Sequence, residues 1–450
     1  MSSRSRATWP LIAVFTAGYL ASYLLPTIVG RLGSGLGLSP AEAGLAGSVL
    51  LLCSAGAGLV LASHVDRIGP QRVARAGLLL TAAGYATAAG TAYLPLVMVG
   101  AAIGGVGSGT VTAVAAGGIA GLQDPHRASA TGLLAVSATA GALYLVLPRL
   151  GGGHSAPFAA VAVVAVLVWP ATGRLGLARA HPPPSGAERR RIPHLRSGSV
   201  LACAMVCWAM AQNSLWGVSS RIGQDQAGLS EVAVGAIFAG SLGAGLIGVA
   251  GAGALGSRLG RALPIGGGTV IISACIALSS SASGLASFAS GEILWNTFYP
   301  VVLSYLIGLA ASLDPRGRWA VLVGSASSLG VACGPVAGSL LAARTGFPMM
   351  GAVLCAALLL LAVPLTAVAL HTAGRPLLPG SVHRKGGAPA AVVAGNLGAV
   401  AGSVPQLGAP ELTVTEIALE PAPRRKYWLT GGGQPKSGSD SNSYASTSAK

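Results

Sequence analysis

Long stretches of this chain are almost wholly apolar, and polar or charged residues cluster in the short segments between them. A helix needs about 20 mostly apolar residues to cross a membrane. The pattern therefore predicts an all-α integral membrane protein with twelve transmembrane helices. The expected spans are residues 9–30, 41–63, 73–93, 95–120, 129–148, 155–173, 198–218, 231–253, 264–283, 285–311, 319–341 and 348–371.

The few charged residues give this scheme an orientation. They make up 9% of the chain, and 28 Lys and Arg residues outnumber 12 Asp and Glu residues. Loops on one side hold only Arg31, Arg149, Arg221 and Arg344, whereas the opposite loops and the tail hold the other basic residues. By the positive-inside rule, both termini are expected in the cytoplasm, and we expect the plasma (inner) membrane. The net charge of +16 then marks orientation, and no nucleic-acid partner is expected.

Composition divides the chain into five segments. They are a cytoplasmic N-terminus (1–8), an N-terminal six-helix bundle (9–173), a cytoplasmic linker (174–197), a C-terminal six-helix bundle (198–371) and a cytoplasmic, mostly disordered tail (372–450). The first apolar run is longer than the core of a signal peptide, so it is predicted to be a retained helix. The six Cys residues fall inside spans without metal-ligand spacing, so we expect no metal or cofactor.

Three short motifs recur 190 or 191 positions further along the chain, each at the same place in its half. Gly37-Leu38-Ser39 recurs as Gly228-Leu229-Ser230, Asp66-Arg67-Ile68-Gly69 as Ser257-Arg258-Leu259-Gly260, and Asp124-Pro125 as Asp314-Pro315. Because six spans are an even number, both halves keep one orientation, which predicts two bundles in parallel repeat. Ser39 and Glu42 also have the spacing of a capping box, so Glu42 is interpreted as a helix cap.

Twelve spans, a parallel repeat and a long central loop resemble the major facilitator superfamily of secondary transporters. The motif after the second span sharpens the resemblance, because Asp66-Arg67-Ile68-Gly69-Pro70-Gln71-Arg72 is similar to the family pattern Gly-x3-Asp-Arg-x-Gly-Arg-x-Arg, with Ala62 in place of the first Gly. The second copy, Gly253 to Arg261, keeps that Gly and loses the acid. In span 11, Gly330-x3-Gly334-Pro335-x2-Gly338 is similar to the Gly-Pro motif that exporters of the family carry in span 5, which leans towards efflux.

The resemblance implies a cytoplasmic gate between the halves. Asp66 would face the positive N-terminus of a helix in the other half, and arginines would complete the charge network. The implied gate residues are Asp66, Arg67, Gly69, Arg72, Arg127, Arg258, Gly260, Arg261 and Arg318. The alternative is that these residues only fix the orientation of the chain in the membrane.

Glu292 stands out because an ionisable residue in the middle of an apolar span is costly and points to function. With Trp295, Asn296 and Tyr299 it has the spacing i, i+3, i+4, i+7, which places all four on one helix face. A carboxylate cannot face lipid cheaply, so this face is expected to turn inward. We interpret Glu292 as a proton-coupling site; the alternative is a paired Glu that locks helix packing.

Further polar and aromatic residues fall in spans that line the central cavity in the family. We expect Thr16, Tyr19, Tyr23, Trp208, Gln212, Asn213, Trp295, Asn296 and Tyr299 to line it. Aromatic rings with a few amides suit an amphiphilic organic solute with limited charge. Tyr93, Trp169 and Trp216 lie near span ends and are interpreted as interfacial anchors instead. The Gly-rich run 104–109 is interpreted as a helix-packing face and not as a dinucleotide loop.

The sequence thus predicts a non-enzymatic, monomeric secondary transporter that moves a small organic solute by alternating access, driven by protons. Without a Walker A sequence, ATP is not expected as its energy source. Two alternatives remain open: a facilitator without proton coupling, and a non-transporting membrane sensor or scaffold that acts through its basic tail.

Overall fold

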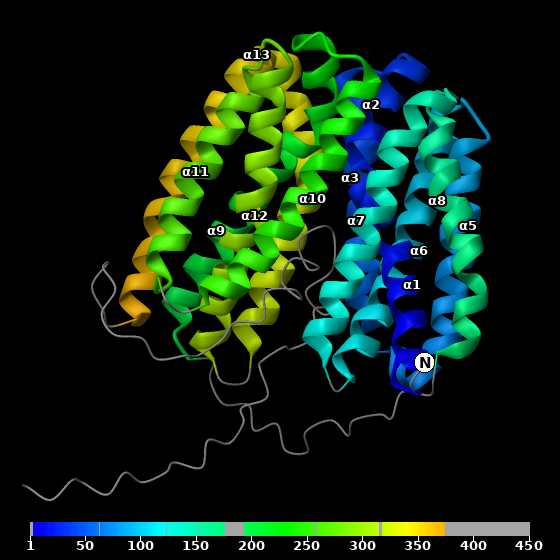
Figure 1. Ribbon diagram of the computed structural model, residues 1–450, viewed down its shortest axis with the longest axis horizontal. Coiled ribbons are helices and arrows are strands. Elements are labelled where there is room, and N and C mark those ends of the chain that lie inside the picture. Colours follow the sequence, from blue (N-terminus) through cyan, green and yellow to red (C-terminus); the bar gives the residue numbers. More distant parts are fainter. Residues whose placement is uncertain are drawn as a thin grey trace, which may run out of the picture. The chain divides into compact units, whose positions relative to one another are not determined.

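The computed structural model describes residues 3–62, 64–122, 124–151, 153–175, 193–256, 259–314 and 317–373, all within one compact unit. These residues form helices and no strand (Figure 1). The helices are α1 (Ser3–Tyr23), α2 (Leu25–Leu36), α3 (Pro40–Ala62), α4 (Val65–Ile68), α5 (Pro70–Ala89), α6 (Leu94–Ala120), α7 (Pro125–Leu150), α8 (Ser155–Val168), η1 (Trp169–Arg174), α9 (Leu195–Arg221), η2 (Ile222–Gln226), α10 (Glu231–Leu255), α11 (Ala262–Ser280), α12 (Leu285–Leu313) and α13 (Arg318–Ala373). Nearly all of the predicted linker and tail lies outside the described residues.

The described residues contain nine helices that are long and apolar enough to cross a membrane, or ten if the bent pair α1 and α2 is one span. The all-helical membrane class predicted from the sequence is therefore confirmed. Helix α5 falls on the expected span 73–93 but is not among these helices. It begins with Pro70, Gln71 and Arg72, and these polar first turns lower its mean hydropathy.

One expected span is broken in the structure, and two others lie on either side of a sharp bend. The expected span 9–30 is broken at Leu24, where α1 and α2 meet at 45°. Pro26 explains the break, since proline has no N–H to donate and its ring collides with the preceding helical turn. The expected spans 319–341 and 348–371 correspond to the two helical parts of α13, which meet at a non-helical break at Gly346, whose φ of 79° suits glycine.

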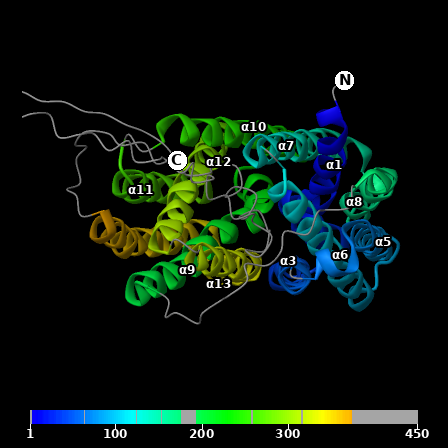
Figure 2. The same cartoon turned by 90° about the horizontal axis from the view of Figure 1, so that it is seen from below.

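Short connections make successive long helices run in opposite directions (Figures 1 and 2). In Figure 1 the N-terminus lies at the lower end of the helices, here named the proximal end, and α2 leads to the upper, distal end. The N-terminal half comprises α1 to η1, and the C-terminal half comprises α9 to α13. Helices α3 and α7 of the first half pack against α13 and α10 of the second.

The repeated motifs begin or end helices in the same way. Gly37 and Gly228 have φ values of 64° and 65°, which place both in the left-handed region that favours glycine. Ser39 and Glu42 form the expected capping box at the start of α3, because the Ser39 N–H donates to Glu42 Oε2 at 2.9 Å and the Glu42 N–H to Ser39 Oγ at 3.3 Å. Ser230 caps α10 likewise, as its Oγ accepts from the Ala233 N–H at 3.3 Å.

Glycines of α6 let neighbouring backbones approach closely. Gly104 lies against Gly84 on α5, and Gly105 and Gly109 lie against main-chain atoms of α3. A Cβ would collide with the Tyr85 ring at Gly104 and with the main chain of α3 at Gly105 and Gly109, so the run packs helices together as expected.

A similar seam joins the halves in their distal part. Gly44 of α3 lies against Ser339 of α13, and Gly47 of α3 lies against the Pro335 side chain. The N–H of Val336 donates to Ser48 Oγ on α3 at 3.0 Å, which adds a hydrogen bond across the halves.

The close contact of α6 with α3 predicts a specific stability effect. A Cβ on Gly109 would collide with the Ser54 carbonyl oxygen, whereas a Cβ on Gly117 of the same helix meets no atom within 4 Å. We expect Gly109→Ala to destabilise the protein by about 1–3 kcal/mol through overpacking. Gly117→Ala should be neutral or slightly stabilising, since alanine favours helices. Unfolding temperatures in detergent check this; equal temperatures for the two variants would contradict the packing.

Candidate functional site

Glu292 lies in the third turn of α12 and is fully buried, so its side chain faces the protein interior as expected. Its Oε1 accepts hydrogen bonds from Ser219 Oγ of α9 at 2.9 Å and from Ser279 Oγ of α11 at 2.7 Å. Its Oε2 has no hydrogen-bond partner among the described residues. The carboxyl group is therefore held inside the C-terminal half by two neutral hydroxyls.

The two serines differ in what else they can bind. Ser219 Oγ also lies 3.0 Å from the main-chain oxygen of Leu215, a second acceptor for its single proton. When Glu292 is ionised, Ser219 donates to it. When Glu292 carries a proton, Ser219 can donate to Leu215 and accept from the carboxyl group. This arrangement supplies a hydrogen-bond pattern for both protonation states.

The aromatic and amide residues predicted for α9 and α12 come together beside Glu292. Trp295 Nε1 donates to Gln212 Oε1, and the ring of Trp208 stacks on Tyr299 with centroids 5.3 Å apart. The rings of Trp295 and Tyr299 lie 5.6 Å apart. Asn296 Nδ2 donates to the main-chain oxygen of Glu292 at 3.1 Å, which ties the cluster to the acid.

A cavity of about 570 Å³, part of it open to solvent, lies beside this cluster. Tyr23, Asn213, Trp295, Asn296 and Tyr299, five of the residues expected in a solute cavity, are among its lining residues. The full lining is Tyr23, Leu133, Ser137, Asn213, Trp216, Leu242, Gly245, Leu246, Val249, Trp295, Asn296, Tyr299 and Pro300. All thirteen are uncharged, and ten of them belong to the C-terminal half.

The other four residues expected in the solute cavity are not among its lining residues. Trp208 and Gln212 are fully buried and support Tyr299 and Trp295. Thr16 donates to the Ile12 carbonyl, and Tyr19 packs on Phe15 with ring centroids 4.4 Å apart.

Trp216 was expected to be an interfacial anchor, and the structure corrects this. Its side chain is 3% exposed and lines the cavity. The expected span ended at residue 218, but α9 continues to Arg221 and the π-helix η2 extends to Gln226. Trp216 therefore lies deeper than its sequence position suggested. Tyr93, by contrast, is 68% exposed at a helix start, in keeping with an anchor.

An ion pair that the sequence did not reveal joins the halves at the distal end. Arg31 of α2 is 6% exposed, and its Nε lies 2.7 Å from Glu231 Oε1 at the start of α10. Its other nitrogens donate to the carbonyls of Leu147, Gly151 and Gly153 at 2.7–3.2 Å. We name this group the distal ion pair. The sequence identified Arg31 only as one of the few basic residues in the loops of this side.

The residues of the implied gate lie at the proximal end. Arg67, Arg72 and Arg127 are exposed, Gly69 and Gly260 have φ values of 100° and 68°, and neither the Asp66 side chain nor Arg258 is among the described parts. Arg261 Nη1 donates to Ser312 Oγ at 2.6 Å, and Arg318 Nε lies 2.6 Å from Asp314 Oδ2. Both bonds stay within the C-terminal half, so a gate between the halves stays a prediction.

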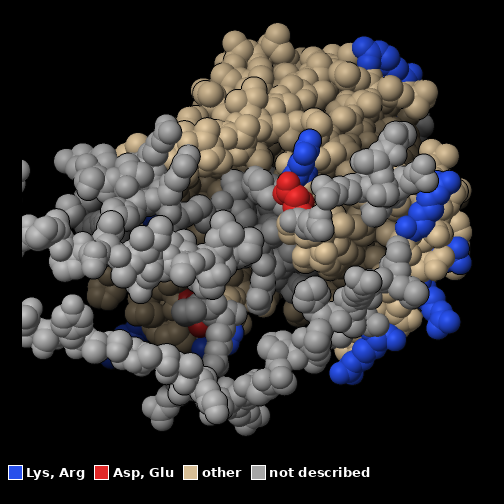
Figure 3. All heavy atoms as spheres, turned by 60° about the horizontal axis from the view of Figure 1, so that its bottom comes forward, with Lys and Arg blue, Asp and Glu red and all other residues tan. Residues whose placement is uncertain are grey.

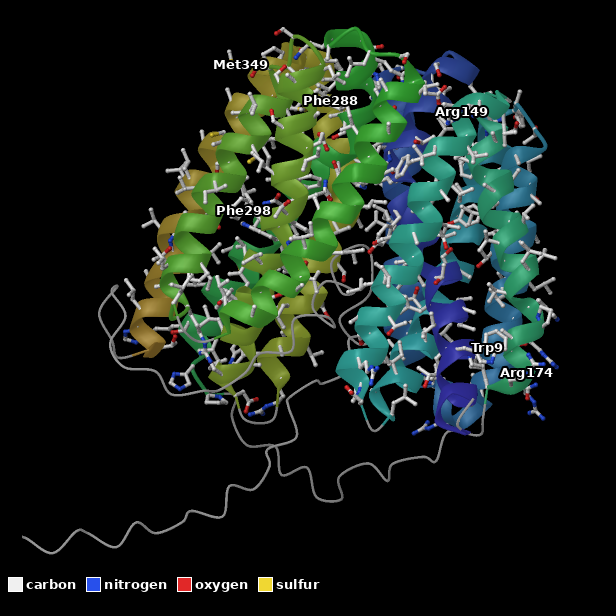
Figure 4. All side chains as sticks on the ribbon, in the orientation of Figure 1. Trp9, Arg149, Arg174, Phe288, Phe298 and Met349 are labelled. Atoms are coloured by element: carbon white, nitrogen blue, oxygen red, sulfur yellow. The ribbon has the colours of Figure 1, made fainter. Side chains whose placement is uncertain are left out.

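Basic side chains gather at the proximal end of the N-terminal half. Figure 3 turns the proximal end forward and shows Lys and Arg side chains along the rim of the N-terminal half. Figure 4 shows Trp9 and Arg174 together at the proximal end, where the Arg174 guanidinium lies 5.3 Å from the Trp9 ring centroid. Phe288, one turn before Glu292, lies towards the distal end.

Apolar helices that alternate in direction and surround a buried, uncharged cavity define a multi-pass membrane protein. The model of the Major Facilitator Superfamily matches residues 11–318, and the chain belongs to this superfamily. The resemblance seen in the sequence is thereby confirmed, and the protein is a membrane transporter and not an enzyme.

A solved structure similar in fold is the crystal structure of the human organic anion transporter MFSD10 (TETRAN). It shares 18% sequence identity and a TM-score of 0.59, over 81% of this chain and 100% of that chain. No curated protein matches the chain by sequence.

The distal ion pair predicts that Glu231 helps to hold the halves together. Glu231→Gln should weaken the distal closure by about 1–3 kcal/mol, the value of a charge-assisted hydrogen bond. In a cysteine-free background, spin labels at Ser34 and Ser283, both exposed near the distal end, should then show longer or broader distances. Glu42→Gln, which alters a cap within the N-terminal half, is the matched control. An unchanged distance distribution in Glu231→Gln would refute a closing role for the pair.

Proposed function

We propose that the protein is a proton-coupled secondary transporter of a small organic solute that works by alternating access. In this proposal the solute binds in the cavity, and the two halves rock around it. The observation that carries the proposal is the buried carboxyl group of Glu292, which lies directly behind the cavity wall on the same helix as Trp295, Asn296 and Tyr299.

We further propose twelve spans in two six-helix bundles, monomeric, in the plasma membrane with cytoplasmic termini. The interruption at Gly346 supports a division of α13 into two spans, because 56 residues of helix far exceed the thickness of a bilayer. The bent pair α1 and α2 counts as one span, and α5 supplies the span whose first turns are polar.

Contacts between the halves support a conformation that is closed at its distal end. The distal ion pair, the seam of α3 on α13, and Gly235 against the Tyr144 carbonyl all lie in the distal part. Under the proposed orientation this state opens towards the cytoplasm, which suits loading of a solute for export.

Glu292 suits proton coupling because both of its protonation states find hydrogen-bond partners. Its charged form accepts from two serines, and its neutral form can donate to Ser219 while Ser219 turns to Leu215. A Glu that served packing alone would be expected to have both carboxyl oxygens bonded, whereas Oε2 has no partner among the described residues.

The test is the substitution Glu292→Gln in proteoliposomes, with a solute first identified by thermal stabilisation of the purified protein. We expect loss of accumulation driven by a pH gradient, because an amide carries no exchangeable charge. Exchange of labelled for unlabelled solute should persist. Glu42→Gln, an equal change at a helix cap, should retain full coupling.

Gradient-driven accumulation by Glu292→Gln at the rate of the unsubstituted protein would overturn the coupling role. Transport that ignores an uncoupler in the unsubstituted protein would show a facilitator instead.

A further inference from the structure

We propose that the cavity selects organic cations with an apolar or aromatic body. This inference rests on the proposed function, because it assumes that the cavity is the solute site. Its first support is the wall itself. Trp216, Trp295 and Tyr299 line the cavity as one connected cluster, with ring centroids 5.6 Å apart in both pairs. Aromatic faces carry negative charge density and attract ammonium or phosphonium groups.

One amide of the wall, that of Asn296, offers an acceptor oxygen to the solute. Asn296 Nδ2 donates to the main-chain oxygen of Glu292 at 3.1 Å, and Asn213 Nδ2 donates to that of Ala209 at 3.0 Å. A carbonyl oxygen only accepts, so in each amide one N–H of the NH₂ group points to the helix, and Oδ1 lies on the other branch of the amide. Asn296 is partly exposed at the cavity, where its Oδ1 remains as an acceptor.

The indole N–H groups of the wall are buried, and its hydroxyl donors are those of Tyr23, Ser137 and Tyr299. Trp295 Nε1 is bound to Gln212, and Trp216 Nε1 is buried beneath the protein surface. A carboxylate would therefore meet hydroxyl donors but no cationic side chain in the lining, whereas a cation meets ring faces and the acceptor oxygen of Asn296.

The charges around the cavity also favour a positively charged solute. All thirteen lining residues are uncharged, and the acid behind them, Glu292, is bound by two neutral serines. The charge of Arg31 is already matched by Glu231 and three carbonyls at the distal end. An organic cation in the cavity thus lies near an acid that has only neutral partners in its bonds, while an anion would lie near it without compensation. The proposed solute of this chain is a cation, whereas its structural neighbour is described as an organic anion transporter.

The test compares three probes of similar shape on the purified full-length protein. They are tetraphenylphosphonium (a cation), triphenylphosphine oxide (neutral) and tetraphenylborate (an anion). Isothermal titration calorimetry, with protein-free micelles subtracted, gives Kd for each. We expect the cation to bind at least about tenfold more tightly than either other probe. Equal or tighter binding of the anion or the neutral probe would overturn the inference, and so would no binding of any probe.

A pair of variants locates the binding site. Trp295→Leu keeps an apolar side chain but removes the ring from the wall, so it should raise Kd for the cation by about tenfold. Trp169→Leu removes a partly buried tryptophan of η1, outside the cavity lining, and should leave Kd unchanged. Equal Kd values in Trp295→Leu and the unsubstituted protein would place the cation elsewhere and overturn the assignment.

The outcomes separate this inference from the proposed function. Proton-coupled transport of an organic anion would overturn cation selection and leave the transport mechanism intact. Selective cation binding without any transport in proteoliposomes would leave the chemistry of the cavity intact and overturn the transport role.

Discussion

The site depends on how the Glu292 carboxyl group is held among apolar helices. A charge at membrane depth needs hydrogen-bond partners, and here they come from Ser219 and Ser279 on two neighbouring helices. These bonds fix the rotation of α12. The same rotation directs Trp295, Asn296 and Tyr299 to the cavity, since they follow Glu292 by three, four and seven residues. One constraint thus positions both the acid and the wall in front of it.

Recognition and closure are divided between different parts of the molecule. Ten of the thirteen lining residues belong to the C-terminal half, so this half carries most of the solute contacts as well as Glu292. The N-terminal half contributes Gly-rich surfaces that let backbones approach, and it supplies Arg31 to the distal ion pair. Glu292 is linked to the distal end of α9 by Ser219, which lies three residues before the π-helix η2 begins. Such π-helical turns often occur at functional sites.

Local spacing predicted much of this arrangement. The all-helical membrane class, the capping box at Ser39, the packing role of the glycines of α6 and the inward face of Glu292 each depend on neighbours within a few residues. Contacts between distant segments could not be predicted in this way. Arg31 and Glu231 are 200 positions apart, and nothing in either neighbourhood identifies the other. The depth of Trp216 was missed because hydropathy does not reveal that α9 continues through a π-helical turn.

The central claim, that Glu292 exchanges a proton inside the membrane, can be measured without knowing the solute. Infrared difference spectra between acidic and alkaline buffer report the carbonyl stretch of a protonated carboxyl group. The account predicts a band from a buried carboxyl group that changes with pH, is absent in Glu292→Gln and is retained in Glu42→Gln. A spectrum of Glu292→Gln identical to that of the unsubstituted protein would contradict it.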